Sequence, residues 1–294
     1  MTAYFEEFIS KYKKILETEL ATAIDKLEAP LTLKDAMAYS LKAGGKRIRP
    51  LLLFAAIDAF GEKPETGLQT AIALEMVHTY SLIHDDLPSM DDDDLRRGKP
   101  TNHKVFGEAM AILAGDGLLT YSFQLIANDP YLDSDKKIRL LHLLSKSAGP
   151  EGMVGGQVAD IQAENRNLKI ADLEYIHNHK TGRLLTFSVM GGAIIGGATE
   201  LELTLLEKFS GHLGLAFQIS DDILDVEGDE GIIGKPIGSD NGKLKCTYPS
   251  LLSLEGAKTH LSSHIEEAKH CLAQTNLKTD LLENLTELVA GRDR

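Results

Sequence analysis

Residues 70–100 read "TAIALEMVHTYSLIHDDLPSMDDDDLRRGKP", an apolar run that ends in a dense acidic cluster. Apolar side chains recur in the first part at helical spacing, which predicts a helix with a broad buried face. Pro88 has no N–H to donate, so we expect the helix to bend or end just after Asp85 and Asp86. Four more aspartates and three cations follow the turn: Asp91 to Asp94, Arg96, Arg97 and Lys99. Acids at a helix end beside cations suit a site for a metal-bound polyanion.

A second acidic cluster lies in "LEKFSGHLGLAFQISDDILDV", residues 206–226. Its periodicity also predicts a helix, and Asp221 and Asp225 are four positions apart on one face. A single acidic run is usually a solvated surface, but both clusters continue helices that are otherwise apolar. Two such clusters can hold several Mg²⁺ ions, because magnesium prefers carboxylate oxygens and is completed by waters and substrate phosphates.

A basic segment, "LKAGGKRIRP" at residues 41–50, precedes both acidic clusters. Gly44 and Gly45 free the backbone, and Pro50 is favoured as the first residue of a helix. Cations around a helix N-terminus favour anion binding, although a basic surface loop is the alternative for this segment alone. Together the three elements predict a Mg²⁺-dependent site for diphosphates inside a helical bundle.

The composition and periodicity of the chain agree with a helical globular protein. The chain has 294 residues, of which 43% are hydrophobic, and helical periodicity recurs along it. We therefore predict an all-α fold with one domain over residues 1–294. The net charge of −13 disfavours nucleic-acid binding. We expect no membrane span and a cytoplasmic location, because no signal sequence and no uncharged apolar stretch of about 18 residues is found.

The motifs resemble those of the trans-isoprenyl diphosphate synthases. The two aspartate motifs and the basic motif occur in that family's order, together with four shorter segments: "GMVGGQVADI" (152–161), "HKTGRLL" (179–185), "IGKPIGSD" (233–240) and "KCTYPSLL" (245–252). The resemblance implies the isoprenoid synthase fold, an all-α bundle of about ten or more helices around a central cavity. Within the family it is closest to the bacterial short-chain enzymes, which condense isopentenyl diphosphate with dimethylallyl and geranyl diphosphate to give farnesyl diphosphate and diphosphate.

The resemblance also implies roles for individual residues. Three Mg²⁺ ions are expected with substrate bound, and their ligands correspond to Asp85, Asp86, Asp91, Asp221 and Asp225. The allylic diphosphate would contact Arg96, Lys180 and Lys235. Isopentenyl diphosphate would bind Lys46, Arg49, His78 and Arg97. Catalytic roles fall to Lys180, Thr181, Gln218 and Lys235, and oxygens of Thr181 and Gln218 would face the developing cation. Asp160 would support the site, or would be an ordinary acid on a helix face.

Product length is a separate inference. In the bacterial-type enzymes an aromatic residue five positions before the first aspartate often closes the tail pocket, and here that residue is Tyr80, followed by Ser81. The resemblance therefore implies a C15 product and a homodimer. The alternatives are a geranylgeranyl or longer-chain synthase, and a non-catalytic subunit of a heteromeric synthase. A terpene cyclase is disfavoured by the basic motif, and a simple acidic binding module by the spacing of the cations.

Overall fold

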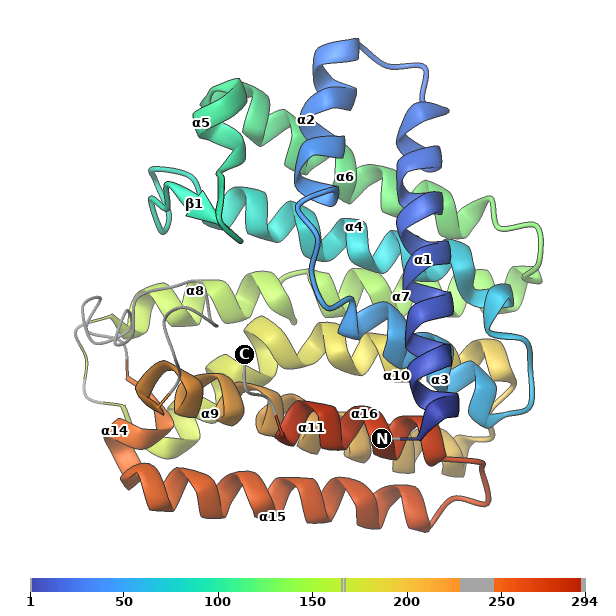
Figure 1. Cartoon of the computed structure of the whole chain (residues 1–294), viewed down its shortest axis with the longest axis vertical. Helices are drawn as coiled ribbons and strands as arrows, with labels where there is room; N and C mark the ends of the chain where they lie inside the picture. Colours follow the sequence, from blue (N-terminus) through green and yellow to red (C-terminus); the bar gives the residue numbers. More distant parts are fainter. Residues whose placement is uncertain (1, 165, 167, 228–245, 292–294) are drawn as a thin grey trace. The chain divides into compact units, whose positions relative to one another are not determined.

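The computed structural model describes residues 2–164, 166, 168–227 and 246–291 of the chain. They form an almost entirely helical protein (Figure 1), which confirms the predicted all-α class. Two of its helices are short and not α-helical, namely η1 (Pro64–Gly67) and η2 (Asn178–Gly182). The α-helices are α1 (Ala3–Asp25), α2 (Leu31–Leu41), α3 (Ile48–Ala59), α4 (Leu68–Asp85), α5 (Asn102–Phe106), α6 (Glu108–Ala127), α7 (Ser134–Ala148), α8 (Met153–Ala163), α9 (Ile170–His177), α10 (Arg183–Gly196), α11 (Glu200–Glu227), α14 (Tyr248–Leu252), α15 (Leu254–Ala273) and α16 (Asp280–Ala290).

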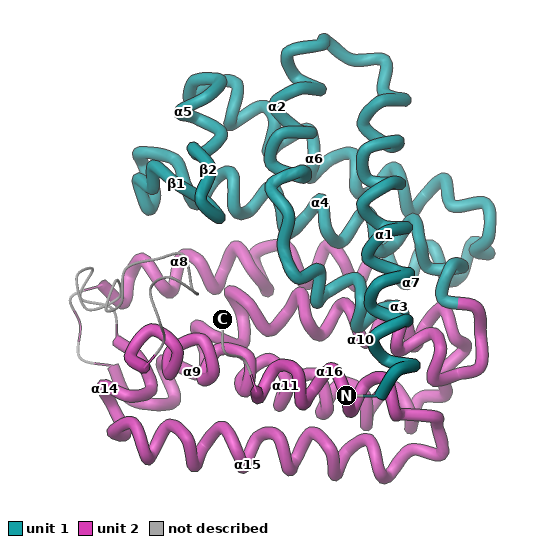
Figure 2. Tube along the Cα trace, in the orientation of Figure 1, with its two compact units in different colours: residues 1–54, 64–141 teal, residues 55–63, 142–294 magenta. Residues whose placement is uncertain are grey.

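The chain forms two compact units, which Figure 2 colours separately. Unit 1 comprises Met1–Phe54 and Pro64–Leu141, and unit 2 comprises Ala55–Lys63 and His142–Arg294. The first aspartate motif and the basic motif belong to unit 1, and the second aspartate motif belongs to unit 2. That residues 1–294 form one domain remains a prediction.

The core of unit 1 is built around α4. Most of this helix is buried because its apolar residues leave no polar face, and it packs chiefly against α6. Helix α4 ends at Asp85, three residues before Pro88, as the sequence predicts. Helix α3 begins at Ile48 rather than at the expected Pro50. Pro50 is nevertheless accommodated, because the first-turn N–H groups of a helix have no partner within it.

Two short strands interrupt the helical pattern of unit 1. Strands β1 (Leu95–Arg96) and β2 (Lys99–Pro100) pair antiparallel, in a hairpin that the sequence analysis did not identify. Its two turn residues, Arg97 and Gly98, both have positive φ, with values of 53° and 74°. This conformation is typical of tight two-residue hairpin turns.

Helix α6 is long and apolar enough to cross a membrane by length and composition, unlike any other helix among the described residues. The sequence argument required an uncharged apolar stretch, and it therefore did not select α6, because this helix carries Asp116 in its middle. The core helix of a water-soluble protein passes the same test, and α6 packs against α4, α2 and α5 within unit 1.

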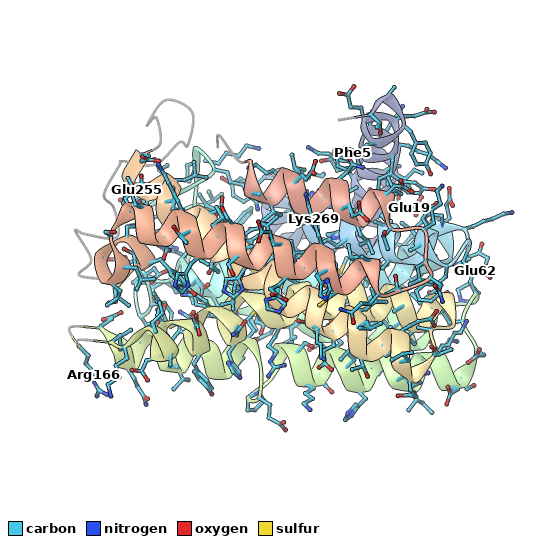
Figure 3. The ribbon with its side chains drawn as sticks, turned by 90° about the horizontal axis from the view of Figure 1, so that it is seen from below. Phe5, Glu19, Glu62, Arg166, Glu255 and Lys269 are labelled. Atoms are coloured by element: carbon cyan, nitrogen blue, oxygen red, sulfur yellow. The ribbon has the colours of Figure 1, made fainter. Side chains whose placement is uncertain are left out.

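Unit 2 is organised around the long helix α11. Helices α10 and α15 lie along it, and α16 packs against both α11 and α15. Figure 3 shows Glu255 at the start of α15 and Lys269 in its second half. Glu255 complements the positive end of the helix dipole. The Nζ atom of Lys269 lies 2.9 Å from the Glu287 carboxylate of α16.

The π-helical turn η2 is held between α8 and α11 by glycine contacts. A Cβ atom on Gly156 of α8 would lie 2.1 Å from the backbone nitrogen of Lys180. A Cβ atom on Gly214 of α11 would lie 3.1 Å from the Cα of Gly182. Such π turns inside helices are frequent at functional sites. Here the turn carries Lys180 and Thr181, two of the predicted site residues.

Replacing Gly156 with alanine should therefore destabilise the protein. The new methyl group meets backbone rather than a flexible side chain, and overpacking of this kind costs about 1–3 kcal/mol. We expect the melting temperature to fall by about 5 °C. Gly211→Ala on α11 is the matched control, because nothing lies within 4 Å of its added Cβ. A helical alanine there should raise stability slightly. Calorimetry that found both variants equally stable would disprove the close packing.

Candidate active site

The first aspartate motif is gathered at the C-terminal end of α4. After Asp85 the chain turns through residues 87–90 and returns, so that the backbone N–H of Asp91 donates to the carbonyl oxygen of Asp85 at 2.8 Å. Asp92 has a φ of +53° and donates its N–H to the carbonyl of Leu87 at 3.1 Å. The four-residue spacing between Asp86 and Asp91 is thus the length of a closed turn, which brings Asp85, Asp86 and Asp91 to one helix end.

Asp86 is buried and bonded to the hairpin. Arg96 donates from Nε to its Oδ1 at 2.9 Å and also from Nη2, and Nη2 lies 3.4 Å from Asp93. Burial raises the pKa of Asp86 above its usual value, and the hydrogen bonds from Arg96 offset only part of that rise. The hairpin is anchored by Thr101, whose hydroxyl donates to the carbonyl of Asp93 at 2.9 Å. Arg96 is therefore fixed against the first aspartate motif.

The basic motif meets the other hairpin arginine. The Arg97 guanidinium donates to the carbonyl oxygen of Gly44, and a Cβ on Gly45 would lie 2.8 Å from it. Both glycines have positive φ, at 85° and 132°. On the same segment, the Nη1 of Arg49 lies 3.4 Å from the Nε2 of His78 on α4. The structure thus brings together three segments of unit 1, namely the basic segment, the hairpin and α4. Lys46, next to Gly45, is exposed.

His78 is a neutral imidazole in this basic setting. Its burial, followed by the charges of Arg49 and Arg97, lowers its pKa well below the usual value. A neutral ring can donate or accept a hydrogen bond according to its tautomer. A neutral imidazole among several cations is suited to bind an anionic group that stays charged while it is bound.

The sequence analysis missed the buried partner of Arg47. Arg47 has a φ of +56°, and its Nη1 lies 2.5 Å from the Oε1 of Glu75 on α4. A second bond runs from Nη2 to the carbonyl of Leu41 at 2.7 Å. Both side chains are almost fully buried. The sequence feature that could have indicated this pair is Glu75, a single acid within the apolar run. This pair fixes the basic segment to α4.

Tyr80 and Ser81 lie on α4 between His78 and the aspartates. Tyr80 is 6% exposed, and its ring meets the His84 ring edge-on, with centroids 5.7 Å apart. Burial, together with the nearby Asp85 charge, raises its pKa to about 12, so the side chain is an un-ionised phenol. The Ser81 hydroxyl donates to the carbonyl of His78 at 2.9 Å. The bulky ring is therefore held inside unit 1, one and a half turns before Asp85.

In unit 2 a polar chain joins η2 to the second aspartate motif. The hydroxyl of Thr181 donates to the Oε1 of Gln218 at 2.8 Å, and the Nε2 of Gln218 lies 3.4 Å from Asp221. Lys180 is bonded to Asp160 of α8, with 2.6 Å between Nζ and Oδ2. The predicted residues Lys180, Thr181, Gln218 and Asp221 are thus brought together, and Asp160 fixes the lysine. Lys235 lies outside the described residues.

The aspartates of the second motif divide between two environments. Asp222 is buried, accepts a hydrogen bond from the Tyr248 N–H at 2.8 Å and lies 3.6 Å from the Nε2 of His177. Asp221 and Asp225 are half-buried and lie four residues apart on one face of α11. The sequence analysis assigned Asp221 and Asp225 as metal ligands and left Asp222 out, and this assignment stays a prediction. Each unit thus presents carboxylate oxygens, the donors that a hard divalent cation requires, so the residues fit a metal.

Comparison with known proteins identifies the class. Residues 30–288 match the polyprenyl synthetase family, and the chain belongs to that family. The resemblance that the motifs indicated is confirmed. Membership makes the chain a prenyltransferase, and it implies isoprenyl diphosphate substrates and a divalent metal.

The similar proteins include several prenyl diphosphate synthases. The chain is 59% identical to a farnesyl diphosphate synthase of Geobacillus stearothermophilus, with 98% of each chain covered. It is 54% identical to a farnesyl diphosphate synthase of Bacillus subtilis (strain 168), with both chains covered completely. Among solved structures, a FPP/GFPP synthase from Zymomonas mobilis superposes with a TM-score of 0.88 at 33% identity, over 99% of this chain and 100% of the other.

Proposed function

We propose that this prenyltransferase condenses isopentenyl diphosphate with dimethylallyl and then geranyl diphosphate, releasing diphosphate and forming farnesyl diphosphate. The observation that carries the proposal is the gathering of Asp85, Asp86 and Asp91 by the turn after α4, with the basic segment and His78 in the same unit. The identity of 59% with a farnesyl diphosphate synthase supports the C15 product.

The residues divide the chemistry between two diphosphates. Asp85, Asp86, Asp91, Asp221 and Asp225 would hold the divalent cations, proposed as three Mg²⁺ ions, which supply Lewis-acid stabilisation of a departing diphosphate. Arg96, Lys180 and Lys235 would bind the allylic diphosphate, and Arg96 is preorganised for this by the hairpin. Lys46, Arg49, His78 and Arg97 would hold the diphosphate of isopentenyl diphosphate, which stays bonded and needs only cations and hydrogen-bond donors.

The polar chain in η2 and α11 would act on the carbocation. The oxygens of Thr181 and Gln218 are fixed by their mutual hydrogen bond, so their dipoles need no reorganisation when positive charge develops. After the new carbon–carbon bond forms, a proton leaves the condensed cation. The released diphosphate is the proposed base, and no side chain is assigned to that step.

Arg49 provides a specific test of the isopentenyl site. Arg49→Gln removes a charge-assisted contact worth about 1.5–3 kcal/mol, so the KM for isopentenyl diphosphate should rise about 10- to 100-fold. The KM for geranyl diphosphate should change much less. Lys42→Gln removes an exposed cation from the same segment and should leave both constants near those of the parent. Steady-state kinetics with each substrate varied would contradict the assignment if both KM values rose equally.

Activity of the isolated chain tests the proposed reaction. With geranyl diphosphate, isopentenyl diphosphate and Mg²⁺, the purified protein should release diphosphate, and a chelator should stop the release. A non-catalytic subunit of a heteromeric synthase would release none without its partner. The absence of turnover with Mg²⁺ or Mn²⁺ would overturn the proposal.

The remaining proposals concern assembly and product length. A homodimer and a cytoplasmic location are supported by the family resemblance.

The second candidate product is geranylgeranyl diphosphate, since the chain is also 46% identical to a chloroplastic geranylgeranyl pyrophosphate synthase of Capsicum annuum. The buried ring of Tyr80 favours the shorter product.

A further inference from the structure

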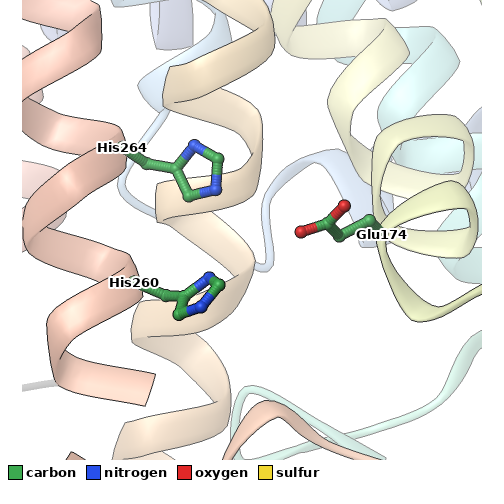
Figure 4. A group of neighbouring side chains, drawn as sticks. All are labelled: Glu174, His260 and His264. Atoms are coloured by element: carbon green, nitrogen blue, oxygen red, sulfur yellow. The ribbon is translucent and has the colours of Figure 1, made fainter. Parts of the chain in front are cut away.

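Unit 2 contains a cluster of nitrogen and oxygen donors outside the aspartate motifs. Glu174 of α9 faces His260 and His264 of α15, as Figure 4 shows. One ligand atom from each residue can be chosen so that all three lie within 4.8 Å of one another. All three residues are half-buried, so the cluster is shielded from solvent without being closed to it. The proposed function uses none of them.

The two histidines have the spacing of a chelating pair. Positions 260 and 264 are four apart on one helix, so the rings project from the same face, and a carboxylate from a second element completes the set. Two histidines and a glutamate are a known three-ligand zinc set that leaves a fourth position for water. Donors around a tetrahedral zinc ion lie about 3.3 Å apart, since each bond is about 2.0–2.1 Å. Closing the cluster thus requires each ligand-atom separation to shorten by at most about 1.5 Å.

A third histidine, His212, orients the set. The Nδ1 of His212 on α11 lies 3.0 Å from the Nδ1 of His264. This contact occupies one nitrogen of His264 and leaves Nε2 as the ligand atom. Metal-bound histidines usually make such a second hydrogen bond.

Tyr248 orients the carboxylate and connects the cluster to α11. Its hydroxyl lies 3.4 Å from the Oε1 of Glu174, and its N–H donates to Asp222. The cluster therefore draws on four helices of unit 2, namely α9, α11, α14 and α15. A cation bound to it would cross-link segments that are far apart in the sequence.

We propose that Glu174, His260 and His264 form a binding site for one transition-metal ion of the zinc class, with His212 as a positioning residue. The site differs in chemistry from the aspartate motifs. Imidazole nitrogens suit Zn²⁺, Co²⁺ and Ni²⁺, whereas Mg²⁺ selects oxygen ligands. A bound ion would stabilise unit 2 by linking α9 to α15.

The test is metal binding to the tag-free, chelator-treated full-length protein. In saturating Mg²⁺, titration calorimetry should give one equivalent of bound Zn²⁺. Co²⁺, used as a spectroscopic probe, should give the intense visible absorption of a four-coordinate site. Zinc at 100 times its Kd should raise the melting temperature by about 5 °C.

Variants assign the binding to this cluster. His260→Ala, His264→Ala and Glu174→Gln should each weaken Zn²⁺ binding at least 100-fold, and His212→Ala should weaken it about tenfold. His270→Ala is the matched control, because His270 is exposed on the same helix outside the cluster, and it should bind as the parent does. Glu174→Gln is nearly isosteric and serves if a histidine variant does not fold. Absence of stoichiometric binding, or equal binding by the parent and all ligand variants, would overturn the proposal.

Discussion

Replacing Asp85 with asparagine is expected to lower kcat by about a thousandfold, which corresponds to about 4 kcal/mol of lost transition-state stabilisation. Asparagine keeps the shape of the side chain and removes the charge that would hold a divalent cation. A cation held by Asp85 would supply several kcal/mol of charge stabilisation to a departing diphosphate, so its weakened binding should affect the chemical step. The backbone bond from Asp91 to the Asp85 carbonyl does not involve the side chain. The fold should therefore be retained.

Asp94→Asn is the matched control for this prediction. Asp94 belongs to the same acidic run, but it is exposed and pairs with Lys104, with 2.7 Å between Nζ and Oδ1. Exposed ion pairs of this kind contribute little. The control should keep kcat within about a factor of two. Initial rates at several Mg²⁺ concentrations, together with melting temperatures, provide the comparison. If Asp85→Asn retained a rate near that of the parent, Asp85 would not be a metal ligand.

Replacing Tyr80 with alanine is expected to change the main product from C15 to C20 or longer. The ring is buried on α4 one and a half turns before Asp85, and its removal creates space on the aspartate-bearing helix. A prenyl chain extending along that helix could then accept another five-carbon unit. We expect the ratio of C20 to C15 product to rise at least tenfold. Tyr80→Ser should act in the same direction.

Loss of a buried aromatic side chain also costs stability, about 3–5 kcal/mol for truncation to alanine. The assays should therefore be run well below the melting temperature. Tyr121→Ala is the control, because this half-buried tyrosine of α6 bonds instead to the carbonyl of Ala23 on α1. It should lower stability without altering the product. The products are identified by chromatography and mass spectrometry. If the Tyr80→Ala enzyme still stops at C15, Tyr80 does not control chain length.

The sequence predicted features that depend on neighbours within one helix. The end of α4 follows from Pro88, and the pairing of Asp221 with Asp225 on one face follows from helical spacing. The return of Asp91 to Asp85 also agrees with the short spacing between the aspartates, although the spacing alone did not specify the hydrogen bond.

Contacts between separate elements could not be predicted in the same way. Arg47 and Glu75 are 28 positions apart, and Arg47 has a positive φ that residue spacing does not indicate. The two-stranded hairpin was missed because strands of two residues have too few positions for alternation to be visible. The histidine spacing on α15 was present in the sequence, but Glu174 is 86 residues before His260, and only the packing of α9 and α15 around α11 and α14 brings them together.

The central claim is that this chain makes farnesyl diphosphate from five-carbon precursors. The most direct measurement incubates the purified parent protein with dimethylallyl diphosphate, an excess of isotopically labelled isopentenyl diphosphate and Mg²⁺, and identifies the product by mass spectrometry. We predict farnesyl diphosphate containing two labelled units as the end product, with geranyl diphosphate as a transient species. A main product of C20 or longer, or no condensation, would contradict the account.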